Sequence, residues 1–82
     1  MGEMPEWLLC PITMEVMGDP VVATDGHTYE RDAITKWLKN NARSPVTNQA
    51  LPGKALITNH AMRSQVMAIM EAKGYVREFD RA

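Results

Sequence analysis

Cys10 is the residue of this sequence whose side chain could most readily act as a nucleophile or bind a metal. It is the only cysteine, so the chain forms no internal disulfide, and the two histidines, His27 and His60, lie far apart. One Cys and two His cannot complete a four-ligand zinc site without carboxylates. A catalytic thiol needs an electropositive, partly exposed setting, whereas Cys10 follows two leucines and precedes a proline. We predict a packed structural cysteine, no metal and no cofactor, with a thiol nucleophile as the weaker alternative.

Other common catalytic patterns are missing from the sequence. It has no glycine-rich phosphate loop, no Gly-x-Ser-x-Gly and no paired metal motif. The formal net charge is −1, and we interpret the charges as interspersed along the chain, which gives nucleic-acid binding little electrostatic support. No apolar run approaches the roughly 18 residues that span a bilayer, and the start lacks a signal-peptide pattern. We therefore expect a soluble intracellular domain that binds neither nucleic acid nor membrane.

With 82 residues and no disulfide or metal, the chain must become rigid through apolar packing and satisfied hydrogen bonds. Asp25-Gly26 between two β-prone runs predicts a hairpin. Apolar residues at spacings of three and four predict a helix over residues 30–40 and another over residues 60–73. A short third strand is expected at residues 55–57.

The domain boundaries follow from these elements. Residues 1–6 are interpreted as a lead-in, residues 7–74 as the domain and residues 75–82 as a tail or linker. Asn59 is a suitable N-cap for the last helix, and Gly74 is placed to end it. We find no internal repeat in the sequence.

Five motifs, taken in order, give the chain a family resemblance. They are Cys10-Pro11-Ile12-Thr13-Met14-Glu15, Asp19-Pro20-Val21, Asp25-Gly26-His27-Thr28-Tyr29-Glu30-Arg31, Ser44-Pro45-Val46-Thr47 and Thr58-Asn59. From about Trp7 to Gly74 the sequence resembles the U-box. That resemblance implies an α+β, zinc-free, RING-like fold with two groove loops, a β-hairpin plus a short third strand, a central helix and a C-terminal helix.

The resemblance also implies a function. A U-box of a ubiquitin ligase holds a ubiquitin-charged conjugating enzyme and promotes transfer of ubiquitin to a substrate lysine, without a covalent intermediate of its own. The substrate would be recruited by other domains. One alternative is a binding or scaffold module that has lost transfer activity, and a small nucleic-acid binder is the weakest. A homodimer stays open, and the expected location is the cytoplasm or nucleus, or the host cytosol for a bacterial effector.

Transferred position by position, the resemblance assigns contact with the conjugating enzyme to six residues: Ile12, Met14, Trp37, Ser44, Pro45 and Asn48. Ile12 could instead be an ordinary core residue, and Trp37 shares a helix face with apolar residues and could pack inward. Met14 is the methionine best suited to an adaptable binding surface. Many ligases of this kind place at position 48 an arginine that clasps the enzyme and its ubiquitin. Asparagine has neither the charge nor the guanidinium fork, which weakens the expected activity.

The resemblance further assigns a polar network that replaces the zinc sites of RING fingers. Its members are Glu15, Asp19, Asp25, Glu30, Arg31 and Asn59. Such groups stabilise a buried site only when every one is satisfied. Asp25 could simply serve the hairpin turn, and Glu30 with Arg31 could be solvated helix residues. Thr58 stands where proline is common, with little expected consequence.

Overall fold

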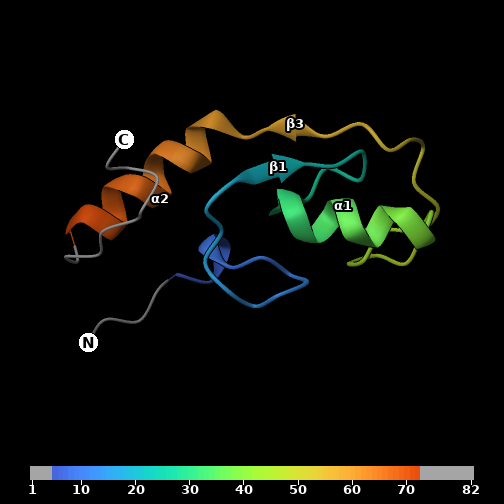
Figure 1. Cartoon of the computed structure of the whole chain (residues 1–82), viewed down its shortest axis with the longest axis horizontal. Helices are drawn as coiled ribbons and strands as arrows, with labels where there is room; N and C mark the ends of the chain where they lie inside the picture. The colour runs from blue at the N-terminus through green and yellow to red at the C-terminus, as the bar shows by residue number, and fades with distance from the viewer. Residues whose placement is uncertain (1–4, 73–82) are drawn as a thin grey trace.

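The computed structural model describes residues 5–72, which form three short strands and two α-helices after a 3-10 turn (Figure 1). The sheet has the order β2-β1-β3, and both strand pairs are antiparallel. In chain order the elements are η1 (Glu6–Leu8), β1 (Pro20–Val22), β2 (Thr28–Glu30), α1 (Arg31–Asn40), β3 (Ile57–Thr58) and α2 (His60–Ala72). The expected α+β class and the order of its elements are thus confirmed.

The predicted hairpin is present, with Val21 opposite Tyr29 at its centre. Its turn closes through two backbone hydrogen bonds, from Ala23 N to the His27 carbonyl at 3.0 Å and from Gly26 N to the Ala23 carbonyl at 3.0 Å. Gly26 has φ +83°, a left-handed conformation that glycine adopts without strain. The Asp-Gly pair therefore turns the chain as the sequence predicted.

Helix α1 begins at Arg31, one residue later than expected, because Glu30 is the last residue of β2 and takes the cap position. Its two fully inward residues, Ile34 and Leu38, join a core with the hairpin and the N-terminal segment. That core consists of Cys10, Met17, Val21, Ala23, Tyr29, Ile34 and Leu38. At the other end of the helix, Lys54 Nζ donates to the Leu38 carbonyl at 2.8 Å, which satisfies an acceptor left free by the helix end.

Strand β3 is Ile57–Thr58, so it begins two residues later and ends one residue later than the predicted strand at residues 55–57. Its position is set by pairing with Val21 and Val22 of β1, a partner that local sequence does not reveal. Asn59 then caps α2 as expected, since its Oδ1 accepts a hydrogen bond from Met62 N at 3.0 Å. Gly74, predicted to end this helix, lies outside the described residues, as do most of the lead-in and all of the predicted tail.

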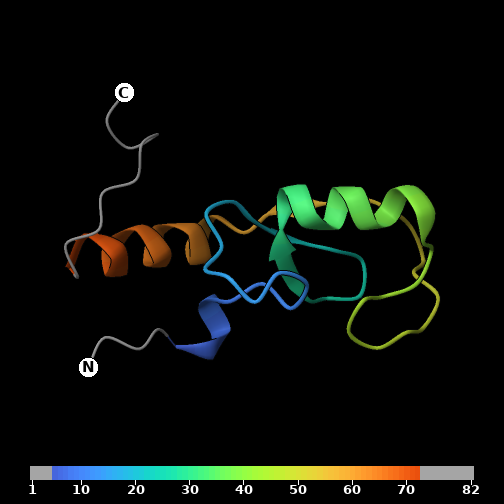
Figure 2. The same ribbon diagram turned by 60° about the horizontal axis from the view of Figure 1, so that its bottom comes forward.

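Two loops lie on the same side of α1, one before the hairpin and one after the helix (Figure 2). We name them the first loop (residues 10–15) and the second loop (residues 44–49). Helix α2 extends from the opposite end of the molecule (Figure 1). Within residues 5–72, neither helix has the length and apolar character needed to cross a membrane.

Candidate protein-interaction groove

The first loop and the second loop have the same backbone course. In the first, Met14 N donates to the Cys10 carbonyl at 2.7 Å and Cys10 N to the Glu15 carbonyl at 2.9 Å. The second loop has the same two bonds between residues at the same spacings of four and five. Asn48 N donates to the Ser44 carbonyl at 2.9 Å, and Ser44 N donates to the Gln49 carbonyl at 2.8 Å. An isolated antiparallel bridge flanks each loop.

Side chains and dihedral angles repeat as well. Thr13 Oγ1 accepts from the amide two residues on at 3.2 Å, and Thr47 Oγ1 does the same at 3.2 Å. The fifth residue of each loop is left-handed, Met14 with φ 61° and Asn48 with φ 63°. The two loops therefore repeat one short backbone motif. The six-residue motifs share only a proline and a threonine in register, which is too little to identify a repeat without the backbone.

A carboxylate on the hairpin holds the second loop in place. Asp25 Oδ2 accepts hydrogen bonds from Ser44 Oγ at 2.6 Å and from Tyr29 Oη at 2.7 Å, while Oδ1 accepts from His27 N at 2.9 Å. Ser44 Oγ in turn accepts from Val46 N at 3.1 Å and from the next amide at 3.0 Å. Asp25 thus serves the turn and also joins the hairpin to the loop.

The environment of this network shifts two pKa values. Burial of Asp25 by itself raises the pKa, but the hydrogen bonds from Ser44, His27 N and Tyr29 outweigh it and bring the pKa of Asp25 below its usual value. Burial and the neighbouring carboxylate raise the pKa of Tyr29 to about 12. The network therefore keeps a charged aspartate and a neutral tyrosine at physiological pH.

A second set of polar contacts supports the first loop and the sheet. Glu30 Oε1 accepts from Gly18 N at 2.8 Å and from Asp19 N at 3.3 Å, and Glu30 N donates to Cys10 Sγ at 3.3 Å. Arg31 Nε pairs with Asp19 Oδ2 at 2.8 Å, and the same guanidinium donates to the Thr58 hydroxyl. A proline at position 58 would have no hydroxyl to accept this hydrogen bond from Arg31.

Asn59 connects this set to α2. Its Nδ2 donates to Thr28 Oγ1 at 3.3 Å while its Oδ1 caps the helix, so one side chain both caps and bridges. Glu15, assigned to the same network, is an exception. Its side chain is exposed and forms no hydrogen bond or ion pair with another residue of the described range 5–72. The expectation for Glu15 is therefore wrong.

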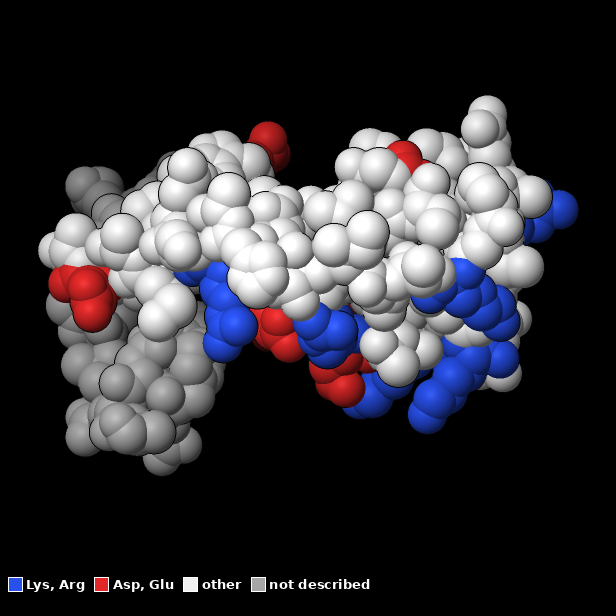
Figure 3. Space-filling view, turned by 90° about the horizontal axis from the view of Figure 1, so that it is seen from above, with Lys and Arg blue, Asp and Glu red and all other residues white. Residues whose placement is uncertain are grey.

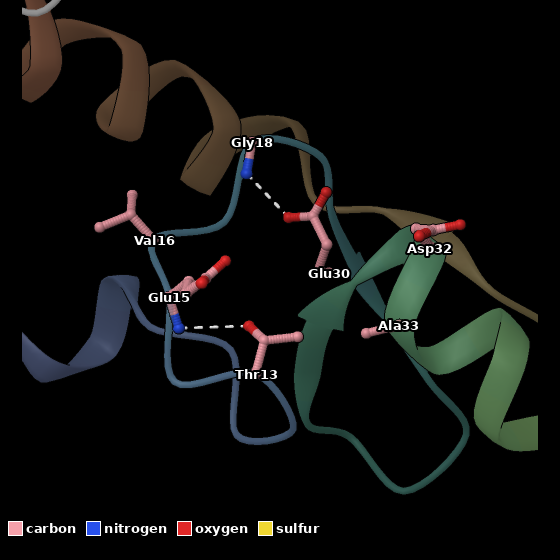
Figure 4. A pocket seen from close by; sticks show the side chains of 7 residues that line it. All are labelled: Thr13, Glu15, Val16, Gly18, Glu30, Asp32 and Ala33. Atoms are coloured by element: carbon pink, nitrogen blue, oxygen red, sulfur yellow. Dashed lines mark hydrogen bonds between the residues drawn. The ribbon is translucent and has the colours of Figure 1, made fainter.

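Glu15 instead lines a hollow of about 300 Å³ between the first loop and the start of α1 (Figure 4). The hollow is lined by Thr13, Glu15, Val16, Gly18, Glu30, Asp32 and Ala33. Its carboxylates do not form a metal centre, and no cluster of three or more His, Cys, Asp or Glu within residues 5–72 is arranged to hold one. Cys10, which the sequence offered as a ligand or nucleophile, has 0% exposure in the core.

The residues predicted to contact a partner differ in exposure. Met14 is 66% exposed, while Ile12, Trp37 and Pro45 are half-buried. Ile12 and Trp37 both pack against the core, the inward packing that the sequence left open for each, and their contact with a partner stays a prediction. Trp37 Nε1 donates to the Arg43 carbonyl at 2.7 Å, which fixes the ring beside the second loop.

Ser44 was expected among the partner contacts, but its exposure is only 2%. Its hydroxyl is used inside the domain, so its side chain supports the loop and does not present a contact surface. Val46, which no prediction named, is 46% exposed and occupies the place in the second loop that Ile12 occupies in the first. We call the exposed and half-buried apolar residues of the two loops and α1 the apolar groove; they are Ile12, Met14, Trp37, Pro45 and Val46. Asn48, two residues after Val46, is exposed as well.

Comparison with known proteins agrees with this geometry. The family model for the U-box domain matches residues 4–75. The chain belongs to the U-box family. It is 48% identical over 63 residues to "U-box domain-containing protein 52" of Arabidopsis thaliana, and 42% identical over 71 residues to "WD repeat, SAM and U-box domain-containing protein 1" of Gallus gallus. The matches cover 77% and 85% of this chain but only 8% and 15% of those proteins.

A solved structure also resembles the domain. The RING finger-like domain of Retinoblastoma Binding Protein-6 matches with a TM-score of 0.77 and 30% identity, covering 94% of this chain and 88% of that one. The U-box described here is thus RING-like in fold, and domains of its family are typical modules of ubiquitin ligases. Because the relatives are many times longer, this similarity concerns the U-box alone.

Proposed function

We propose that this U-box binds a ubiquitin-charged conjugating enzyme in the groove and promotes transfer of ubiquitin to a lysine of a substrate protein. The observation that carries the proposal is the pair of matched loops. They hold apolar side chains partly exposed on a backbone fixed by hydrogen bonds at both loops. Interface hot spots need such anchors, because an anchor that is already ordered loses little entropy on binding.

In this mechanism the domain acts by positioning. The apolar groove would hold the conjugating enzyme and favour the arrangement of its thioester in which a substrate amine attacks. Cys10 is buried, and the amide of Glu30 donates to its sulfur, so a thioester on the U-box itself has no support. Substrate choice would belong to other domains of a longer protein.

One observation favours a second candidate, a scaffold with weak or no transfer. By the family resemblance, Asn48 matches the position where an arginine would clasp enzyme and ubiquitin, and it can offer only a neutral amide. The backbone gives another reason for this residue, since asparagine tolerates a φ of 63° better than most side chains. Asn48 therefore suits the loop whether or not it assists transfer.

A discharge assay separates the two candidates. The parent domain is mixed with a ubiquitin-charged conjugating enzyme and free lysine, and the loss of the thioester is followed with time. Faster discharge than without the domain supports the ligase, provided that Ile12→Ala reduces the effect. Binding without accelerated discharge would favour the scaffold, and no binding to any of a panel of conjugating enzymes would reject both.

Asn48→Arg tests the activating position itself. The new guanidinium should add contacts formed mainly in the reactive arrangement, so it should lower the barrier more than it raises ground-state affinity. A gain of about 1 kcal/mol corresponds to roughly five-fold faster discharge. Affinity for the uncharged enzyme should stay the same. Asn48→Gln is the control, because it lengthens the side chain without charge; equal rates for both variants and the parent would remove Asn48 from the activating position.

A further inference from the structure

Three cations surround the end of α1 beside the second loop. Lys54 reaches the end of the helix through its bond to the Leu38 carbonyl, and Lys39 lies in the last turn. Arg43 lies against the groove, because its carbonyl accepts from Trp37 and its own Nη1 donates to the Asn48 carbonyl at 3.0 Å. We call Lys39, Arg43 and Lys54 the basic rim.

The part of the sequence that contains the basic rim carries positive charges only. Residues 33–70 contain no Asp or Glu, but they contain Lys36, Lys39, Arg43, Lys54 and Arg63. The prediction of interspersed charges was therefore wrong. Figure 3 shows Lys and Arg gathered along the part of the molecule that holds α1. Acidic residues are instead concentrated in residues 1–32, where three of them line the hollow beside the first loop.

Contacts within the domain explain the presence of only some of these cations. Lys36 pairs with Asp32 at 3.3 Å, but within residues 5–72 the rim residues form no ion pair with a carboxylate. The negative end of the helix dipole explains a lysine at Lys39 and at Lys54. It does not explain Arg43, which lies beyond the helix, is exposed and offers more donors than its one bond to the loop uses. The rim thus presents cationic donors to whatever occupies the groove.

We propose that the basic rim steers and selects conjugating enzymes whose surface is acidic next to the part that contacts Pro45. The inference rests on the proposed function, because the rim is continuous with the groove through Trp37 and Arg43. A protein seated on Trp37 and Pro45 would lie beside Arg43, whose carbonyl accepts from Trp37. Lys39 and Lys54, at the end of the same helix, would add to the positive potential that this protein meets on approach. Charges at an interface rim act mainly on the association rate, and salt screens them over about 10 Å at 0.1 M.

The test measures association by stopped flow with a conjugating enzyme that binds the parent domain, at ionic strengths from low to high. We expect the parent association rate to fall about ten-fold as salt rises. Lys39→Gln should lower the low-salt rate and Lys39→Glu should lower it further, by roughly three- to ten-fold, with a small change in dissociation rate. Arg43→Gln, which keeps a donor for the Asn48 carbonyl, should act in the same direction. All rates should converge at high salt.

A matched control carries the same net charge as Lys39→Glu on a distant surface. Ser64→Glu combined with Gln65→Glu adds two negative charges on exposed positions of α2, at the other end of the molecule. It should leave the association rate near that of the parent. The proposed role of the basic rim would be rejected if the association rate were insensitive to salt, or if the control and Lys39→Glu lowered it equally. Either result would leave the proposed function intact. A parent domain that binds no conjugating enzyme would overturn both.

Discussion

The first loop and the second loop share one backbone course, yet they are attached to the domain by different chemistry. Cys10 of the first loop has a buried sulfur, a weak acceptor, that takes one hydrogen bond from Glu30 N at 3.3 Å, and Ile12 packs against the core. Ser44, at the same place in the second loop, binds a charged aspartate and two amides, while Val46 is left exposed. One loop is thus secured mainly by apolar burial and the other by a polar network. The two should respond differently to mutation and pH.

Loss of the Asp25 carboxylate should have the largest effect. Asp25→Ala leaves the hydroxyls of Ser44 and Tyr29 and the His27 amide without their acceptor, and we expect it to lower the free energy of unfolding by about 3 kcal/mol. Chemical denaturation measures the change. Asp32→Ala is the control, because within residues 5–72 this exposed carboxylate forms only the helix pair with Lys36, and its loss should cost less than about 0.5 kcal/mol. Equal losses in both variants would show that the network does not hold the second loop.

The second-largest effect is expected from truncating Ile12 and Val46, the apolar residues at the same place in the two loops. Ile12→Ala should weaken binding to the conjugating enzyme by about 2 kcal/mol and Val46→Ala by about 1 kcal/mol, the range of interface truncations. Both variants should fold, although Ile12→Ala also loses some core packing and Val46→Ala does not. Titration calorimetry combined with thermal melts gives both numbers. If Ile12→Ala fails to fold, Ile12 belongs to the core and the groove is assigned wrongly.

Changing the pH should affect the second loop on both sides of neutrality. Tyr29 has its pKa raised to about 12 from about 10, so its contribution to stability is complete below pH 10 and is lost as the pH rises through 12. Asp25 has a lowered pKa, so its contribution is present above pH 4 and is lost as the pH falls through the folded value. We expect an alkaline loss of roughly 1–2 kcal/mol from Tyr29. It should disappear in Tyr29→Phe, and its persistence there would assign it to another group.

Exchanging the left-handed residues should have the smallest effect. Met14→Asn should stabilise the domain by about 1 kcal/mol, because asparagine tolerates a φ of 61° better than methionine. Asn48→Met should destabilise it by a similar amount. Met14→Asn should at the same time weaken binding of the conjugating enzyme, since an exposed apolar contact is removed. A stabilised variant with unchanged affinity would show that Met14 lies outside the interface.

Local signals in the sequence predicted the hairpin, both helices and the cap at Asn59. Each depends on neighbours within a few residues, such as Asp25-Gly26 or the apolar spacing of α1. Strand β3 was predicted two residues too early at its start and one too early at its end, because its bounds depend on pairing with β1 and on the contact between Arg31 and Thr58.

The site was harder to predict for the same reason. Asp25 could be assigned to a network, but its partners Tyr29 and Ser44 come together only when the second loop folds against the hairpin. The family resemblance assigned Ser44 to the partner contacts, and nothing local in the sequence indicates that its hydroxyl is buried. The likeness of the two loops, which places Val46 where the first loop has Ile12, became visible only in the backbone, because the two motifs share only a proline and a threonine.

The buried sulfur of the first loop also gives the domain a built-in kinetic probe. Cys10 is the only thiol in the chain, and a modifying reagent can reach it only when the first loop moves away from the core. Labelling times under native conditions therefore report how often this segment opens, separately from global unfolding. A bound partner that clamps the loop would slow the labelling, so occupancy of the groove could be followed by mass spectrometry on the unmodified protein.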